Sequence, residues 1–175
     1  MKLIWLDLET TGLDPNACDI LEIAAVGASI ENPTVTQYLI NTPVWHGGGG
    51  LSKFIRRMHT SNGLLRECKI APGLWTVGAL FDGILREFIG DDAEKPMLAG
   101  ASVHFDLGFL RRHLPYIADR LSHRVFDTSA ITAFCASMGM PYPNASEPAH
   151  RAMYDIEDSI ERYTHCRNWV EGRSK

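Results

Sequence analysis

The sequence predicts an α/β fold in which helices flank a mixed five-stranded sheet. The first observation is a continuous apolar run at residues 3–6, which is typical of a central strand buried on both faces. The second is a pair of strand-like segments that follow it, separated by the turn signal Asn32-Pro33. The third is the later alternation of strand-like and helical segments, which favours strands joined by helices.

The N-terminal part predicts three antiparallel strands. The first begins at Lys2 and gives way to a turn at residues 10–12. The second covers residues 20–30 and the third covers residues 35–40, and strand one is expected to be central in the sheet. A loop must follow at residues 42–52, because four consecutive glycines there give the backbone unusual freedom.

The C-terminal part begins with a polar segment at residues 53–65 and then predicts strand–helix units. Apolar residues recur at helical spacing from Leu74 to Ile89, which makes this the best-defined helix. Pro115 is expected to end another helix. The remaining predicted elements are a strand at 97–101, a helix at 105–112, a short strand at 124–127, a helix at 129–138, a proline-rich loop at 139–148 and a closing helix at 149–170.

The length of 175 residues predicts a single domain over residues 1–175 with a sizeable core. An apolar content of 45% and a charged content of 22% are those of an ordinary globular protein. There is no apolar run of membrane-spanning length and no signal peptide, so we expect a cytoplasmic protein without a membrane partner. The four cysteines lie far apart with no C-x-x-C pair, which favours reduced thiols over disulfides or a zinc site.

Asp7 and Glu9 close the first strand and are the first candidate site residues. Side chains alternate along a strand, so the two carboxylates point to the same side. Two adjacent buried carboxylates repel each other and lose their hydration, and a divalent cation held between them relieves both effects. Oxygen ligands on a rigid element suit Mg²⁺ or Mn²⁺ rather than zinc. Open α/β sheets bind ligands at the C-terminal ends of their strands, where these acids lie.

Three later residues extend this candidate site. Asp106 follows the predicted fourth strand, and Asp155 lies early in the closing helix. His150 precedes Asp155 by five residues, which in a regular helix would leave the two side chains roughly 140° apart. We therefore expect His150 to precede the first helical turn and to act as a general base that moves in with substrate, while the helix holds Asp155 rigidly. His104, two residues from Asp106, stays open as an alternative base.

These residues, in this order, resemble the histidine branch of the DEDD exonuclease superfamily. Its first motif is D-x-E followed by T-G, here Asp7 to Gly12, and its last motif places a histidine five residues before an aspartate. Within the superfamily the chain is most similar to the oligoribonuclease family. The stretches that carry this similarity are LDLETTGLD, MHTSNGL, FDTSAI and AHRAMYDIEDSIE.

The resemblance implies a ribonuclease-H-like fold, two bound Mg²⁺ or Mn²⁺ ions and 3′-to-5′ removal of nucleotides. It also implies a homodimer that degrades short single-stranded RNA, dinucleotides above all, to nucleoside 5′-monophosphates. In the implied scheme two ions clamp an in-line displacement at phosphorus, and His150 takes the proton of the attacking water. The implied metal ligands are Asp7, which bridges both ions, Glu9 and Asp155 on one ion, and Asp106 on the other.

The resemblance assigns further residues to substrate binding. Leu13 corresponds to a wedge that packs against the bases, and His59 belongs to a histidine-threonine motif. Ser102 and Ser129 correspond to residues near the substrate's backbone and 5′ phosphate. His123 falls where the family has a tyrosine that caps the 5′ side from the partner subunit. Because an imidazole covers less area than a phenol ring, we expect a weakened preference for dinucleotides.

Two other functions stay open. An exonuclease that trims or proofreads longer single strands, DNA included, predicts more basic and aromatic residues along a path away from the site. The net charge of −4 argues mildly against that reading. A binding module that has lost activity predicts the loss of a metal acid or of the histidine, and none is lost. A Rossmann enzyme is excluded, because no G-x-G-x-x-G follows the first strand.

Overall fold

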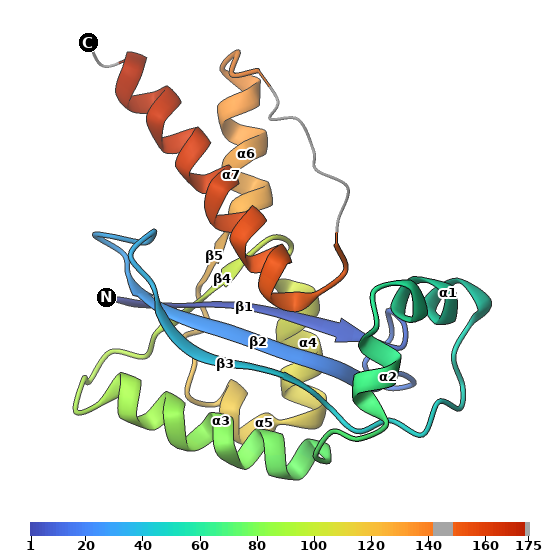
Figure 1. Ribbon diagram of the computed structural model, residues 1–175. Helices are drawn as coiled ribbons and strands as arrows, with labels where there is room; N and C mark the ends of the chain where they lie inside the picture. The colour runs from blue at the N-terminus through green and yellow to red at the C-terminus, as the bar shows by residue number, and fades with distance from the viewer. Residues whose placement is uncertain (142–148, 174–175) are drawn as a thin grey trace.

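The computed structural model describes residues 1–141 and 149–173, and a five-stranded sheet forms its centre (Figure 1). Most of the predicted loop at 139–148 therefore lies outside the described residues. The strands are β1 (Lys2–Thr10), β2 (Ile20–Ser29), β3 (Gln37–Pro43), β4 (Met97–Gly100) and β5 (Val125–Asp127). Their order across the sheet is β3-β2-β1-β4-β5, with β1 to β3 antiparallel and β4 and β5 parallel to β1. The predicted mixed α/β fold with a central first strand is confirmed.

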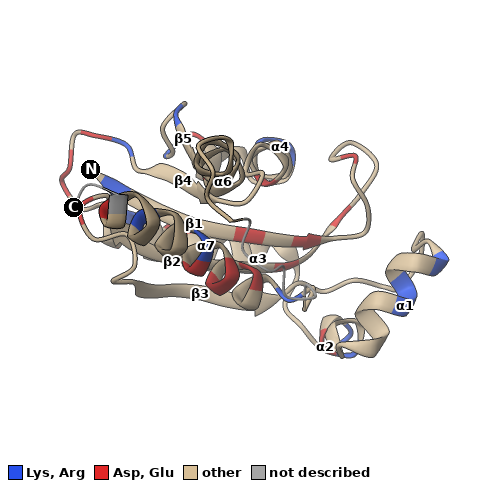
Figure 2. Ribbon diagram, turned by 90° about the horizontal axis from the view of Figure 1, so that it is seen from above, with Lys and Arg blue, Asp and Glu red and all other residues tan. Residues whose placement is uncertain are grey.

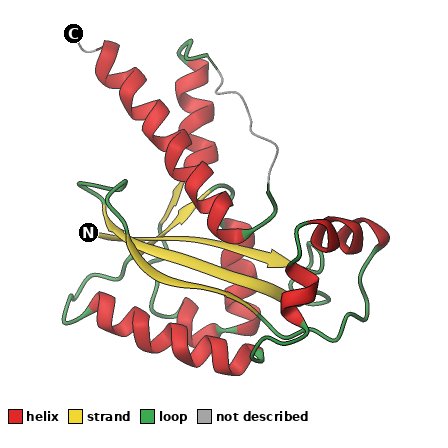
Figure 3. Ribbon diagram, viewed as in Figure 1, coloured by secondary structure: helices red, strands yellow, loops and turns green. Residues whose placement is uncertain are grey.

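Helices of the described chain cover both faces of the sheet (Figure 3). They are α1 (Lys53–Ser61), α2 (Leu64–Cys68), α3 (Leu74–Ile89), α4 (His104–His113), α5 (Pro115–Ala118), α6 (Thr128–Ser137) and α7 (Ala152–Arg173). α3, α4 and α5 pack on one face, and α6 and α7 lie on the other, while α1 and α2 lie beyond the C-terminal end of β1 (Figure 1). Among these helices none is long and apolar enough to cross a membrane.

The alternation of side chains along β1 separates two cores. The even-numbered side chains from Ile4 to Leu8 are buried in the core beneath α3 and α4. The odd-numbered Leu3 and Trp5 are buried in the core that α7 covers. Because Asp7 and Glu9 continue the odd-numbered series, their carboxyl groups lie on the α7 side of the sheet.

The helix α3 has the bounds that its apolar spacing predicts. Val77, Phe81 and Leu85 follow one another at intervals of one turn, and all three are buried against the sheet. The helix ends at Gly90, whose φ of 60° is a left-handed conformation that glycine adopts without strain. Local pattern and tertiary packing agree here, which is why the prediction holds to the residue.

The polar segment at residues 53–65 contains α1 and the start of α2, two helices that the sequence pattern did not predict. Ser52 caps α1, because its hydroxyl accepts a hydrogen bond from the Ile55 backbone N–H at 3.2 Å. Leu64 and Cys68 fix α2 by packing with Leu21 of β2 in a small separate core. This packing partner lies far away in the sequence, so the segment's own pattern does not reveal it.

Three further differences from the prediction exceed a single residue. The third strand spans Gln37–Pro43, later than the predicted 35–40. Pro115 ends α4 but also begins α5, at a position where its missing N–H leaves no helical hydrogen bond unmade. The closing helix begins at Ala152 rather than at residue 149, because His150 has a φ of 51° and a right-handed helix excludes that value.

Candidate active site

Four acidic side chains meet near the C-terminal end of β1. Asp7 and Glu9 belong to β1, whereas Asp106 and Asp155 lie in the first turns of α4 and α7. Figure 2 shows the acidic stretch of β1 beside that of α7. The charges of the other three acids all act on Asp7. The structure thus brings together the four predicted metal ligands.

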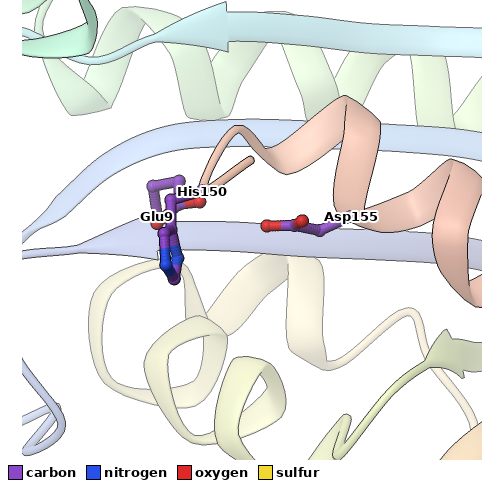
Figure 4. A group of neighbouring side chains, drawn as sticks. All are labelled: Glu9, His150 and Asp155. Carbon is purple, nitrogen blue, oxygen red and sulfur yellow. The ribbon is translucent and has the colours of Figure 1, made fainter. Parts of the chain in front are cut away.

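His150 joins two of these acids. Ligand atoms of Glu9, His150 and Asp155 all lie within 4.8 Å of one another (Figure 4). His150 stands on the short segment before α7, and Asp155 projects from the first turn of that helix. The expectation that the histidine precedes the helix and the aspartate lies within it is therefore confirmed.

Asp106 reaches the cluster from the neighbouring strand–helix unit. The parallel pairing of β1 with β4 ends at Trp5 and Ala99, so β1 extends past the end of β4. In this extension the backbone N–H of Leu8 donates a hydrogen bond to Asp106 Oδ1 at 3.1 Å. Only 3% of Asp106 is exposed. A bond from the central strand therefore fixes its carboxylate.

The environment of the cluster disfavours negative charge in the absence of a cation. Burial, followed by the charges of Asp106 and Glu9, raises the pKa of Asp7 well above its usual range. Burial, followed by the charge of Asp155, raises the pKa of Glu9 to about 8. Burial raises the pKa of Asp106 to about 7. Burial also raises the pKa of Asp155, although the charge of His150 opposes this shift. These acids hold protons at a pH where exposed carboxyl groups have lost them.

This donor set fits a hard divalent cation. Carboxylate oxygens are the ligands that Mg²⁺ and Mn²⁺ prefer in proteins. A bound cation displaces the protons that the raised pKa values retain, and its charge offsets the repulsion among the four acids. The cluster of two buried and two half-buried carboxyl groups, rather than the histidine, is the feature that fits a metal.

His59 lies against the cluster from α1. It is fully buried, and its Nε2 is 3.6 Å from Glu9 Oε2. Burial and the nearby His150 lower the pKa of His59, so the ring is neutral at pH 7. The predicted substrate residue His59 is thus buried behind Glu9 rather than exposed at the surface.

Ser102 and Ser129 lie together at the C-terminal ends of β4 and β5. Their hydroxyl oxygens are 3.4 Å apart, and both backbone N–H groups donate to Asp127 Oδ1, at 3.2 Å from Ser102 and 2.8 Å from Ser129. Ser102 has a φ of 56°, a strained value for a residue other than glycine. Leu13 is 83% exposed in the turn that follows β1. These three predicted substrate residues are thus accessible near the strand ends that carry the acids.

His123 is separated from the other predicted residues. It is exposed and precedes β5. Because β5 runs parallel to β4 and β1, His123 lies at the end of the sheet opposite to the C-terminal strand ends that carry the acids. Its neighbour Ser122 donates a backbone hydrogen bond to Pro96 O, just before β4. Within one chain His123 does not come together with the acidic cluster.

The alternative base His104 is the first residue of α4 and is exposed. It is close in sequence to Asp106, but the group of ligand atoms around Glu9 and Asp155 contains His150. The geometry therefore favours His150 as the imidazole that acts beside these two acids.

Sequence reasoning missed a group of three charged residues beside the cluster. Glu22 is 1% exposed on β2, and it pairs with Arg151, whose Nη2 lies 2.8 Å from Glu22 Oε1. Glu67 of α2 binds the same nitrogen through Oε2, also at 2.8 Å. A glutamate within an otherwise apolar strand was the available signal for Glu22. No local signal joins Glu22 to an arginine 129 residues later in the chain.

Comparison with known families identifies the class of protein. The RNase_T model, described as an exonuclease family, matches residues 4–163. The chain belongs to this exonuclease family, and the predicted enzyme class of 3′-to-5′ exonuclease is confirmed. Membership also implies dependence on a divalent metal, in agreement with the buried carboxyl cluster.

Individual relatives show which members of the exonuclease family the chain resembles. The probable oligoribonuclease of Dictyostelium discoideum is 32% identical over 181 residues, which cover 91% of this chain and 85% of that protein. The oligoribonucleases of Cutibacterium acnes and Streptomyces coelicolor are 30% and 28% identical and cover 94% and 97% of this chain. The alignments cover 84% and 86% of those two proteins. The predicted similarity to the oligoribonuclease family is confirmed.

Solved structures confirm the ribonuclease-H-like fold. The crystal structure of cell-death related nuclease 4 (CRN-4) matches with a TM-score of 0.70 at 19% identity. A metal-free complex of Escherichia coli exonuclease I with single-stranded DNA matches with a TM-score of 0.65 at 15% identity. The matches cover 96% and 91% of this chain but only 64% and 38% of the two solved chains. At these identities the likeness concerns the fold alone.

Proposed function

We propose that this chain is a single-domain, homodimeric 3′-to-5′ exoribonuclease that degrades short single-stranded RNA, dinucleotides preferentially, to nucleoside 5′-monophosphates. The observation that carries the proposal is the cluster of four acids, two buried and two half-buried, with His150 beside Glu9 and Asp155. The names of the relatives support a substrate of short RNA. The four free cysteines fit a cytoplasmic location.

The four acids are proposed to hold two Mg²⁺ or Mn²⁺ ions, with Asp7 between them, Glu9 and Asp155 on one ion and Asp106 on the other. When bound, such ions polarise the phosphodiester and stabilise the charge that develops on the attacking and leaving oxygens. The chain supplies the geometry. The strand β1 fixes Asp7 and Glu9, and the bond from Leu8 fixes Asp106.

His150 is proposed as the general base. Its ring lies beside Glu9 and Asp155, so it is placed to take a proton from a water molecule that attacks the phosphate. It is half-buried and stands ahead of α7 rather than within it. The side chain can therefore adjust to substrate while Asp155 stays fixed in the helix.

Ser102, Ser129 and Leu13 are proposed to bind the substrate. Asp127 occupies the first N–H groups of α6, so the serine hydroxyls are the groups that remain to meet a backbone or 5′ phosphate. Leu13 is apolar and almost fully exposed, as a wedge against bases requires. His59, buried against Glu9, is proposed to act at the innermost end of this path.

His123 is proposed to reach the site of a second subunit. Its position at the N-terminal ends of the parallel strands prevents it from capping the site of its own chain. A homodimer that brings His123 over the partner's C-terminal strand ends would supply the missing 5′ cap. The proposal therefore requires two copies of the chain for a complete substrate site.

A turnover assay tests this function. Two-, five- and twenty-nucleotide RNA and DNA are compared with Mg²⁺, with Mn²⁺ and with EDTA. We expect release of 5′-monophosphates only with metal, and faster cleavage of the RNA dinucleotide than of the longer strands. Equal or faster degradation of the twenty-nucleotide strand would instead show a general single-strand exonuclease. No metal-dependent hydrolysis of any strand would show a binding module.

A further inference from the structure

Arg151 connects the segment that carries His150 to the body of the fold. Its Nη2 lies 2.8 Å from Glu22 Oε1 and 2.8 Å from Glu67 Oε2. Its Nε also donates to both Glu22 oxygens, at 3.1 and 3.2 Å, and its Nη1 donates to Glu67 Oε1 at 3.3 Å. One guanidinium thus bridges β2 and α2. The planar fork of arginine permits this arrangement, whereas a lysine ammonium is a point charge without it.

Glu22 is fixed on both sides. It is 1% exposed, and besides Arg151 it accepts a hydrogen bond from the backbone N–H of Ala152 at 2.9 Å. This N–H belongs to the first residue of α7 and lies directly after Arg151 in the chain. Glu22 therefore fixes the start of α7, one residue beyond the end of the histidine segment.

Asn62 holds the same segment from the other side. Its Nδ2 donates to His150 O at 2.5 Å and to Ala149 O at 3.3 Å. The Asn62 backbone carbonyl in turn accepts a bond from Arg151 Nη1 at 3.4 Å. Asn62, between α1 and α2, and the Arg151 guanidinium therefore jointly restrain the backbone at His150.

The backbone of His150 needs such support. Its φ of 51° lies in the left-handed region, which is strained for a residue other than glycine. A residue keeps this conformation only where its surroundings impose it. The bonds from Asn62 and Arg151 are the restraints that flank it. A different φ would turn the imidazole away from Glu9 and Asp155.

We propose that Arg151 is a positioning residue, which with Glu22, Glu67 and Asn62 fixes the backbone of His150 so that its ring lies beside the metal acids. The proposal rests on the role of His150 as the base given above. It differs from a purely structural role, in which Arg151 would only neutralise the buried charge of Glu22. Both roles predict loss of stability when Arg151 is removed, but only the positioning role acts through His150.

A double-mutant cycle separates the two roles. Cleavage of a diribonucleotide with Mn²⁺ is measured for the wild type, Arg151→Lys, His150→Ala and the double variant. We expect Arg151→Lys to lower kcat roughly 10- to 100-fold, as a displaced catalytic group does, with little change in KM. In the His150→Ala background the same change should have almost no effect. An equal loss of kcat in both backgrounds would overturn the proposal.

Arg167→Lys is the matched control. Arg167 lies on the same helix and pairs with Glu171 at 2.7 Å, but this pair is exposed, and we expect kcat to stay at the wild-type value. If Arg151→Lys does not fold, Asn62→Ala replaces it in the cycle with the same expected pattern. A His150→Ala variant with wild-type turnover would overturn both the base assignment and this proposal. A low rate for His150→Ala with additive losses would overturn only the positioning role.

Discussion

Glu9 and Glu22 lie directly opposite each other on β1 and β2, in the antiparallel register of the sheet. Directly opposite side chains share a face, and two like charges in this position repel each other. Arg151 neutralises Glu22, whereas burial and the charge of the nearby Asp155 raise the pKa of Glu9 to about 8. The two glutamates therefore have different functions. Glu22 holds the start of α7, and Glu9 stays available for the proposed cation.

The first prediction concerns the stability of the metal-free protein. Asp7, Glu9 and Asp106 have higher pKa values in the folded protein than in the unfolded chain. Between the unfolded and the folded pKa of each group, the folded state therefore binds more protons than the unfolded state. Their contribution to stability is complete below the unfolded pKa and is lost as pH rises through the folded pKa. In EDTA we therefore expect Tm to fall from pH 7 to pH 8.5. A loss of 1 kcal/mol lowers Tm by about 2–4 °C at this size. A Tm that rises over this interval would contradict the raised pKa values.

The second prediction is that Asp7→Asn abolishes metal-dependent hydrolysis and raises Tm in EDTA at pH 8. Removing one carboxylate relieves the repulsion within the cluster but removes the ligand proposed to join both ions. Mn²⁺ should raise the Tm of the wild type and have much less effect on the variant. Asp91→Asn is the control, because Asp91 is exposed after α3 and its loss should leave both measurements unchanged. Wild-type turnover by Asp7→Asn would place the active site elsewhere.

The sequence predicted those features that local pattern determines. The two-residue period of a strand was enough to predict β1 and to place Asp7 and Glu9 on the same face at its end. The spacing of apolar residues was enough to predict α3. In contrast, α2 depends on packing against Leu21, and the partner of Glu22 comes from the residue just before α7. Such contacts join segments far apart in the chain, so no pattern within one segment indicates them. The residues that position His150 belong to this second kind.

The third prediction is that His150→Ala lowers turnover by roughly 10²- to 10⁴-fold, the usual loss for a positioned general base. Its effect on Mn²⁺ affinity should be small, because the four acids remain. Isothermal titration with Mn²⁺ and single-turnover cleavage measure the two quantities separately. His104→Ala is the comparison, since His104 is exposed at the start of α4. A greater loss with His104→Ala would reassign the base.

The fourth prediction is that the chain forms a dimer in which His123 acts on the partner's site. Sedimentation at micromolar concentration should give twice the chain mass of 19.5 kDa. His123→Ala and His150→Ala chains, each impaired alone, should recover activity when co-expressed. The mixed dimer then contains one site that has both its own His150 and a His123 from the other chain. A fully active monomer, or no recovery in the mixed dimer, would contradict an action across subunits.

The last prediction concerns substrate length. If Leu13 packs against the bases and a second subunit's His123 closes the 5′ side, a dinucleotide fills the site, and a longer strand must pass the cap. The longer strand then loses the contact between its 5′ phosphate and the Ser129 hydroxyl, which stands 3.4 Å from that of Ser102. A charge-assisted hydrogen bond of this kind contributes about 1.5–3 kcal/mol, or roughly a ten- to hundredfold preference.

We expect 5′-phosphorylated diribonucleotides to be cleaved faster than pentamers by a factor nearer ten than a thousand, because an imidazole covers less of the substrate than a phenol ring. His123→Tyr should sharpen the preference, and Ser129→Ala should reduce it. Ser137→Ala is the matched control, because Ser137 lies at the other end of α6 and its hydroxyl donates to Phe134 O. Competition between labelled dinucleotide and pentamer at equal concentration measures the ratio. A ratio that Ser129→Ala leaves unchanged would show that the 5′ phosphate is bound elsewhere.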